Sequence, residues 1–262
     1  MDGREFFVGV LVAGVVTGIV PPPVDAEADD KRGLEISVTT DWVSKYMFRG
    51  FDILDESGAW QPSVDVGLRD TGLHLNWWTS YASHDRGDDS LGFERRDSDE
   101  YDYTVYWEGD IADCIDVELG FVYYDLIHLD SRADFMEYYG TFTLSDMPLS
   151  PYFGAYYGHE KHDDTLGEGW NTVIGGSHSL PLCGLAFGGT DLTLDLAADV
   201  WYNGGQYNVD TGWSHATFGG GVTFPLCENL EFTPGLYYQL SMEDEINDED
   251  EWWATLSLAY TW

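Results

Sequence analysis

The chain ends on a stretch of uninterrupted alternation, Glu251-Trp252-Trp253-Ala254-Thr255-Leu256-Ser257-Leu258-Ala259-Tyr260-Thr261-Trp262. One set of alternate positions is apolar and consists of Trp252, Ala254, Leu256, Leu258, Tyr260 and Trp262. The intervening set is mixed and mostly small or hydroxylated. Because successive side chains of a β-strand point to opposite faces, this period of two predicts a strand with one wholly apolar face.

Working back from this stretch, the same alternation recurs along the chain between clusters of Gly, Pro, Asp and Asn. It predicts twelve strands near 34–50, 59–69, 73–83, 99–109, 114–124, 136–145, 150–158, 168–179, 191–203, 214–224, 230–241 and 251–262. Most have about ten residues, which is the length that a tilted strand needs to cross the hydrocarbon core of a bilayer. The segment 150–158 fits least well, because both of its faces carry Tyr or Phe.

The connections between these strands alternate in length. Short turns are expected at 70–72, 110–112, 146–148 and 226–228, with 180–190 as a long exception. Longer acidic connections follow the odd-numbered strands, at 84–98, 125–135, 159–167 and 243–251. This asymmetry predicts an all-β fold: a transmembrane antiparallel up-and-down β-barrel of about twelve strands, with short periplasmic turns and longer acidic extracellular loops. An even number of strands places both termini in the periplasm.

A soluble, secreted β-sandwich that acts as a binding module is the alternative fold, since its strands also have one apolar and one polar face. Three features favour the barrel: the regular alternation of loop lengths, the end of the chain on an aromatic strand, and the aromatic residues at strand ends. The last are Trp42, Trp60, Trp107, Tyr123, Trp170, Tyr202 and Trp252.

The N-terminus has the features of an export signal. An apolar run from Phe6 to Val20 follows Arg4 and is broken by the prolines at 21–23. Small residues around Ala28 offer a cleavage site, and the run is short for a spanning helix. We therefore expect a signal peptide at 1–28, a barrel at 29–262, and a location in the outer membrane of a Gram-negative-type bacterium.

The charge is strongly acidic, with 48 Asp and Glu against 11 Lys and Arg. Nucleic acid is therefore excluded as a partner, because phosphate binding needs clustered basic residues. Loop acids such as Asp97, Asp99, Glu100 and the run at 243–251 could hold Ca²⁺ or Mg²⁺, although no loop has EF-hand spacing. A solvated acidic surface is the simpler explanation for them, and no cofactor is expected.

Three cysteines, Cys114, Cys183 and Cys227, form no CxxC pair, which argues against zinc. Cys183 and Cys227 fall in neighbouring predicted periplasmic turns, so a disulfide between them is conceivable in an oxidising compartment. The candidate Ser–His pairs do not have the spacing of a catalytic pair: His178 and Ser179 point to opposite faces, while His74 and Ser80 lie about 20 Å apart along one strand. We do not expect an enzyme.

The first predicted hairpin resembles that of the TorF-type porin family. The matching residues are Thr39 to Gly50 (TTDWVSKYMFRG), then Gln61, Gly72 and Trp78-Thr79-Ser80. The sequence departs from the family pattern in having Trp42 for a Tyr and in the insertion of Ser44 and Lys45. Leu258, Tyr260 and Trp262 are similar to the signal read by the barrel-assembly machinery. The resemblance implies a passive pore, with membrane lipid, that machinery and small solutes as partners.

The residues expected to line the pore are charged and alternate with the apolar set. They are Asp41, Lys45, Arg49, Asp65, Arg69, Asp102, Glu137, Asp195 and Asp199, with Glu108, Asp116, Glu118 and Glu231 on the same faces. For the first hairpin we predict a register that pairs Asp41 with Arg69, Lys45 with Asp65 and Arg49 with Gln61.

A mostly acidic lumen predicts a channel for passive diffusion of small solutes or ions, with a preference for cations. A barrel of twelve strands is narrow, so the same charges could instead form internal ion pairs that close it. The sequence leaves open both the channel and a non-conducting structural barrel.

Overall fold

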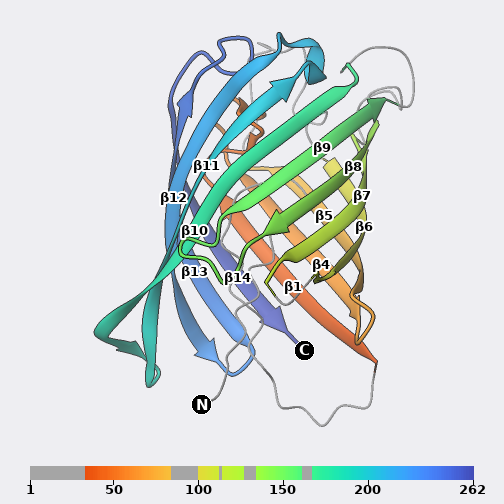
Figure 1. Cartoon of the computed structure of the whole chain (residues 1–262). Helices are drawn as coiled ribbons and strands as arrows, with labels where there is room; N and C mark the ends of the chain where they lie inside the picture. Colours follow the sequence, from red (N-terminus) through yellow and green to blue (C-terminus); the bar gives the residue numbers. More distant parts are fainter. Residues whose placement is uncertain (1–32, 84–99, 112–113, 127–133, 161–166) are drawn as a thin grey trace.

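The computed structural model describes residues 33–83, 100–111, 114–126, 134–160 and 167–262, and these form a closed antiparallel barrel (Figure 1). The wall consists of β1 (Leu34–Val43), β4 (Ala59–Leu68), β5 (Leu73–Ala82), β6 (Glu100–Asp110), β7 (Asp116–Asp125), β8 (Phe135–Thr143), β9 (Tyr152–Glu160), β10 (Gly169–Phe187), β11 (Thr190–Gly204), β12 (Gly212–Cys227), β13 (Leu230–Ser241) and β14 (Glu251–Thr261). Sequential wall strands pair with each other, and β1 closes the barrel against β14. The prediction of an all-β barrel of twelve strands is confirmed.

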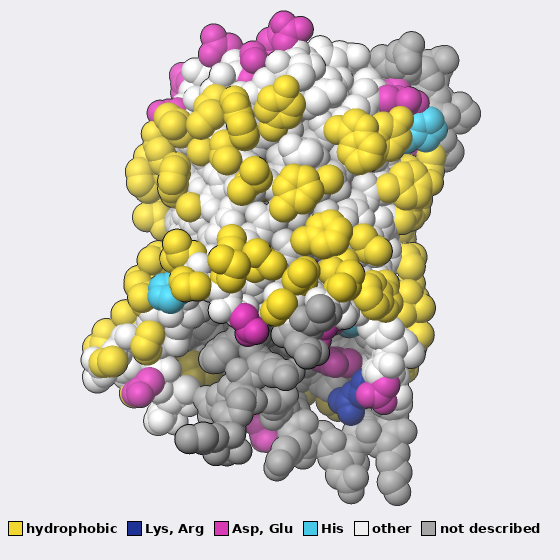
Figure 2. All heavy atoms as spheres, in the orientation of Figure 1, with side chains coloured by type: hydrophobic (Ala, Val, Ile, Leu, Met, Phe, Trp, Pro, Cys, Tyr) yellow, Lys and Arg dark blue, Asp and Glu magenta, His cyan; other side chains and the backbone are white. Residues whose placement is uncertain are grey.

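The outer surface carries a belt of large apolar side chains, which Figure 2 shows as a broad yellow band across the face in view. Leu236, Ile174 and Leu75 are each more than half exposed there. Exposed tryptophans such as Trp60, Trp170 and Trp252 lie at strand ends. A surface of this kind is costly in water but suits the hydrocarbon core and its interfaces, where aromatic residues gather.

The described part of the chain contains no helix that is long and apolar enough to cross a membrane.

The two faces of β14 follow the predicted alternation. Trp252 and Leu258 are exposed on the outside, whereas Trp253 and Thr255 are buried inside. Pairing of Val38 with Tyr260 and of Trp42 with Leu256 places apolar partners side by side on the outer face. Cross-strand contacts of this kind stabilise the seam that joins the first and last strands.

The predicted register of the first hairpin is wrong. Asp41 pairs with Gln61, not with Arg69, because β1 ends at Val43 instead of continuing to residue 50. The shift from 69 to 61 is an even number of residues, so the side chains of β1, up to Val43, keep their predicted faces although their partners change. Residues 44–58, which we call the lumenal hairpin, leave the wall at this point.

The connection between β10 and β11 is also shorter than predicted. It is a two-residue turn at Gly188 and Gly189, both with positive φ, as a tight hairpin turn requires. The strands on either side continue past the rim and project from the barrel at the lower left of Figure 1. The fully described turns at this end have two to four residues, apart from the eight-residue connection at 144–151, which is longer than predicted. We call this end the short-turn end.

Several sequence-based expectations concern residues outside those described. The signal peptide at 1–28, the whole loop at 84–98 and the loop acid Asp99 lie there. The loop acid Asp97 belongs to that loop. They remain predictions.

Candidate functional site: the lumen and its hairpin

The inner face of the wall is lined by buried polar and charged side chains. The inward positions of β5 and β6 include Asn76, Asp102 and Thr104, and all three side chains are almost fully buried. Towards the short-turn end, His74 lies between two carboxylates, with Nδ1 2.8 Å from Asp65 Oδ1 and Nε2 3.2 Å from Glu108 Oε1. Such groups are tolerated inside a membrane barrel because water and partner charges satisfy them.

The lumenal hairpin folds back from the long-loop end into the barrel. Its two short strands, β2 (Met47–Phe48) and β3 (Phe51–Asp52), pair across a turn formed by Arg49 and Gly50. Both turn residues have positive φ, at 49° and 99°. A Cβ on Gly50 would lie 2.8 Å from His215 Nδ1 and from Ile246 Cγ2, so only glycine fits between the turn and the wall.

Apolar side chains fix the hairpin to opposite sides of the wall. Tyr46 and Phe48 belong to a buried cluster with residues of the wall. The wall residues of this cluster include Trp78, Tyr124, Phe135, Tyr139, Tyr156 and Trp201, from β5, β7, β8, β9 and β11. On the other side, Met47 packs with Tyr237 of β13 and Trp253 of β14. The hairpin therefore spans the lumen rather than lying along one strand.

Arg49, at the tip of the hairpin, forms a buried ion pair with Glu137 of β8. Its Cζ lies 4.5 Å from the ring centre of Tyr156 and 5.6 Å from that of Trp201, and Nη1 is 3.5 Å from Gln206 Oε1. Burial alone would lower the pKa of Arg49, but the negative charge of Glu137 outweighs this effect and raises the pKa above its ordinary value. The guanidinium therefore stays charged inside the barrel.

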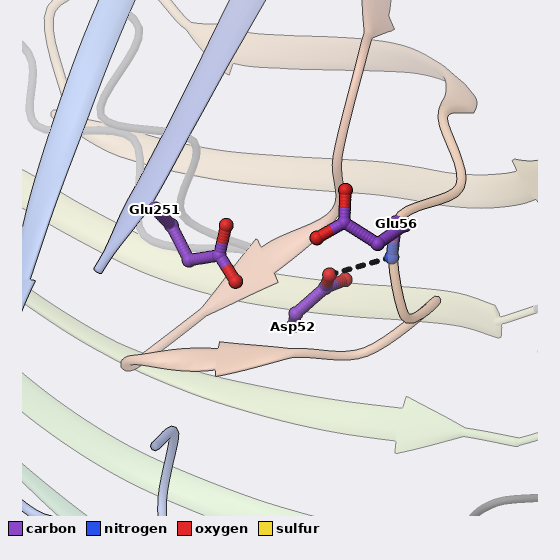
Figure 3. A group of neighbouring side chains, drawn as sticks. All are labelled: Asp52, Glu56 and Glu251. Carbon is purple, nitrogen blue, oxygen red and sulfur yellow. Dashed lines mark hydrogen bonds between the residues drawn. The ribbon is translucent and has the colours of Figure 1, made fainter. Parts of the chain in front are cut away.

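A second ion-pair network lies at the base of the hairpin. Figure 3 shows the carboxylates of Asp52, Glu56 and Glu251 gathered at one place. One carboxylate oxygen of each residue lies within 4.8 Å of the other two. Lys45 Nζ bonds to both Glu56 and Glu251, and the backbone N–H of Glu56 donates to Asp52 Oδ2 at 2.7 Å. Oxygen ligands suit Ca²⁺ or Mg²⁺. In this structure, however, the ammonium group of Lys45 neutralises part of the cluster.

The pKa values in this network follow from burial and charge. Desolvation would lower the pKa of Lys45, but its bonds to Glu251 and Glu56 raise it overall. Burial raises the pKa of Asp52, and the backbone hydrogen bond from Glu56 opposes that rise. The hairpin is thus held by two cations, Lys45 at its base and Arg49 at its tip.

Together these contacts close the lumen at the level of the hairpin. A small cavity of about 20 Å³ lies beside Arg49 and Gly50, bounded by Trp201, His215 and Gln239. Gln239 Nε2 also donates to the carbonyl oxygen of Gly50 at 2.8 Å. A cavity of this size has room for about one water molecule.

The predicted pore-lining residues divide into three groups. Asp102, Glu137, Asp199 and Asp65 lie on the inner wall as expected, and Asp41 and Asp195 also face inward. Lys45 and Arg49 lie in the lumen, but on the hairpin and not on β1, so their predicted pairing with Asp65 and Gln61 is wrong. Arg69 lies in the turn after β4, where its N–H donates to Gly33 O at 3.1 Å.

The most important residues that sequence reasoning missed are aromatic. Tyr46 and Phe48 continue the apolar alternation of the predicted strand at 34–50, which places them on the outer face, yet they are 1% and 7% exposed inside the barrel. Gln206 and Tyr207, in the short helical turn η2 (Gln206–Asn208), were not singled out at all. The Gly204-Gly205 pair that precedes them is the sequence signal that could have indicated a turn entering the lumen.

The remaining predicted sites lie at the surface. Cys114, Cys183 and Cys227 are exposed free thiols in this structure, so the disulfide between Cys183 and Cys227 stays a prediction. Leu258, Tyr260 and Trp262 of the predicted assembly signal are exposed on the outer face of the last strand.

Comparison with known proteins gives a match of fold without a match of sequence. No family model matches the chain, and no curated protein is detectably similar. Among solved structures, the KdgM porin aligns over 86% of this chain and 98% of its own, with a TM-score of 0.51 and 8% identity. The NanC porin covers the same shares, with a TM-score of 0.51 and 9% identity. The chain has the fold of a small outer-membrane porin.

The structural similarity to the KdgM and NanC porins shows the fold alone. At such low identity it carries no substrate and no residue roles to this chain. The first hairpin resembles that of the TorF-type porins, but no family model matches the chain, so this resemblance stays a prediction.

Proposed function

We propose that the protein is an outer-membrane channel for passive diffusion of small solutes or ions, with a preference for cations. The observation that carries this proposal is the closed barrel with an apolar outer belt and a charged inner face. Only closed barrels and helices satisfy all backbone hydrogen bonds within a membrane. A soluble sandwich would have two open sheets and no reason for such a belt.

The preference for cations follows from the lumenal charge. Carboxylates on five or more wall strands face inward, including those of Asp65, Asp102, Glu118, Glu137 and Asp199. The basic side chains of the lumen, Lys45 and Arg49, are both paired with carboxylates. Rings of acidic side chains raise the local concentration of cations and repel anions.

Conduction in this proposal requires the lumenal hairpin to move, because the hairpin fills the lumen in the structure. Its ends are fixed at Val43 and Ala59 on neighbouring strands, while its tip is held by side-chain contacts. Breaking those contacts would free the tip without opening the wall. The wild-type channel is therefore expected to have a low or intermittent conductance.

A non-conducting structural barrel is the second candidate, and the same closed lumen favours it. The two candidates differ in what happens when the hairpin is removed. Single-channel recording in planar bilayers should compare the wild type with a variant in which a short Gly-Ser turn replaces residues 45–57. A channel predicts brief openings in the wild type and a steady conductance in the variant. A variant that assembles as a heat-modifiable barrel but never conducts would overturn the proposal.

The remaining parts of the proposal concern location and assembly. The short-turn end would face the periplasm, and the long acidic loops the outside. Export through a signal peptide at 1–28 and recognition of Leu258, Tyr260 and Trp262 by the barrel-assembly machinery would bring the chain to the outer membrane. Membership of the TorF-type porins belongs to this proposal as well. Cell fractionation and heat-shifted gel mobility test these points together.

A further inference from the structure

Arg49 lies in a pocket whose chemistry is specific for a planar cation. Glu137 supplies a carboxylate, Gln206 Oε1 an acceptor at 3.5 Å from Nη1, and Tyr156 and Trp201 two aromatic faces within 6 Å of Cζ. A carboxylate, an amide oxygen and aromatic faces are the groups that recognise a guanidinium. We call these four residues the guanidinium pocket.

The wall strands and η2 build this pocket without help from the hairpin. Tyr124 OH donates to Glu137 Oε1 at 3.2 Å. Gln206 is held by Asn171, which donates to its side chain, and by Asn203, which donates to its backbone oxygen at 3.1 Å. A Cβ at Gly158 would lie 1.8 Å from Gln206 Nε2, so this glycine is needed to make room for the glutamine. The site is therefore preorganised by contacts that do not involve Arg49.

The aromatic walls of the pocket are fixed in the same way. Tyr156 stacks with Tyr139 at 5.8 Å and with Trp201 at 5.4 Å, and Trp201 stacks with His215 at 5.8 Å. All four rings belong to wall strands. This continuous row of rings presents π-faces to the lumen at the level where the hairpin tip lies.

Arg49 does not use the full capacity of the pocket. It bonds to Glu137 Oε1, while Glu137 Oε2 has no hydrogen-bonding partner among the residues that the structure describes. Arg49 Nε is likewise unpartnered there. A free guanidinium, which is not constrained by a hairpin turn, can turn to bond both carboxylate oxygens in the bidentate arrangement.

We propose that the guanidinium pocket binds small solutes that carry a guanidinium group, and that Arg49 occupies it as an internal competitor. The inference rests on the proposed channel function, because such solutes reach the pocket through the lumen. A solute that fills the pocket replaces the tip contact of the hairpin, so binding and hairpin release are coupled. Compact ammonium ions carry the same charge but match the planar pocket less well.

Chemical rescue of the Arg49→Ala barrel tests the pocket directly. Removing the arginine side chain leaves Glu137 buried and unpaired, so methylguanidinium should stabilise this variant. At ten times its dissociation constant, the apparent melting temperature in detergent should rise by roughly 3–5 °C. Methylammonium should need a concentration at least about tenfold higher for the same rise. The wild type, whose pocket is filled, should show little response to either ion.

Two further variants make the result decisive. Arg49→Ala combined with Glu137→Gln lacks the carboxylate and should lose the methylguanidinium response. Arg69→Gln, in the turn after β4, retains Arg49 and should respond as little as the wild type does. If Arg49→Ala fails to assemble, the barrel with residues 45–57 replaced by a short turn exposes the same pocket. Equal responses to methylguanidinium and methylammonium, or a response that survives Glu137→Gln, would overturn the inference.

Channel recording separates this inference from the proposed function. In a conducting variant, millimolar methylguanidinium should block the potassium current, and Glu137→Gln should weaken the block at least about tenfold. A current that methylguanidinium does not block selectively would contradict guanidinium binding in the pocket but not the proposed channel. Chemical rescue without any current would contradict the proposed channel but not guanidinium binding in the pocket.

Discussion

The guanidinium of Arg49 and the carboxylate of Glu137 meet inside the barrel with side chains that are 1% and 0% exposed. One residue lies on the tip of the lumenal hairpin and the other on β8 of the wall. This ion pair therefore fixes the tip of the lumenal hairpin to the wall of the barrel.

Removing one member of the pair should destabilise the barrel. Arg49→Met or Glu137→Leu each leaves an uncompensated buried charge, with an expected cost of about 3–5 kcal/mol in the free energy of unfolding. The double variant Arg49→Met/Glu137→Leu should recover most of that loss, because no charge stays unpaired. Urea unfolding of the reconstituted barrel measures all three variants. A double variant as unstable as the sum of the single ones would contradict this role for the pair.

Enlarging Gly50 should displace the hairpin without removing any charge. Gly50→Val adds a β-branched side chain where φ is 99° and where His215 and Ile246 leave no room. We expect a loss of about 1–3 kcal/mol in stability and a larger open fraction in single-channel recordings. Gly33→Val is the matched control, since no atom lies within 4 Å of a Cβ at that position. An unchanged open fraction in Gly50→Val would argue that the hairpin does not limit the current.

An arginine placed on the lipid-facing belt should cost more stability near the middle of the bilayer than beyond its edge. Leu236→Arg in β13 and Ile174→Arg in β10 place a cation on exposed apolar positions of the outer face, with an expected cost of about 2–4 kcal/mol. Leu185→Arg, on the projecting part of β10, should cost about 0–1 kcal/mol because it lies beyond the rim. Unfolding from phospholipid vesicles measures each variant. Equal costs at all three positions would argue against a membrane-spanning belt.

The thiols offer a simple check of the short-turn end. Because Cys114, Cys183 and Cys227 are exposed, all three should react with iodoacetamide in the folded protein without reductant. Mass spectrometry should then show three additions. A single addition that becomes three after reduction would instead show one disulfide, and finding the single addition on Cys114 would assign it to Cys183 and Cys227.

The strands of the wall could be predicted from sequence because their constraint is local. Lipid on one side and a polar lumen on the other impose a period of two, and Trp252 and Trp253 illustrate it at 60% and 3% exposed. The register of β1 with β4 could not be predicted in the same way. Any even shift keeps the faces unchanged, so Gln61 and Arg69 are equivalent partners for Asp41 as far as alternation is concerned.

The lumenal hairpin escaped prediction because aromatic side chains suit both environments. Tyr46 and Phe48 continue the alternation of β1 and look like lipid-facing residues, but they pack against Tyr124 and Trp78 inside the barrel. The chain turns back into the lumen at Arg49 and Gly50, both of which have positive φ. This turn is a property of the fold, and the alternation of apolar residues does not reveal it. Glu137 was expected to line the lumen, but its partner could only be known once the hairpin had been placed.

The central claim is that a cation-preferring path exists beneath the lumenal hairpin, and its most direct test is a reversal potential. The barrel with residues 45–57 replaced by a short turn should be recorded in a planar bilayer under a tenfold KCl gradient. The acidic inner wall predicts a reversal potential of the sign that K⁺ selectivity gives, reduced when Asp102 and Glu137 are changed to Asn and Gln. A reversal potential at zero, or one of the sign that Cl⁻ selectivity gives, would contradict the claim.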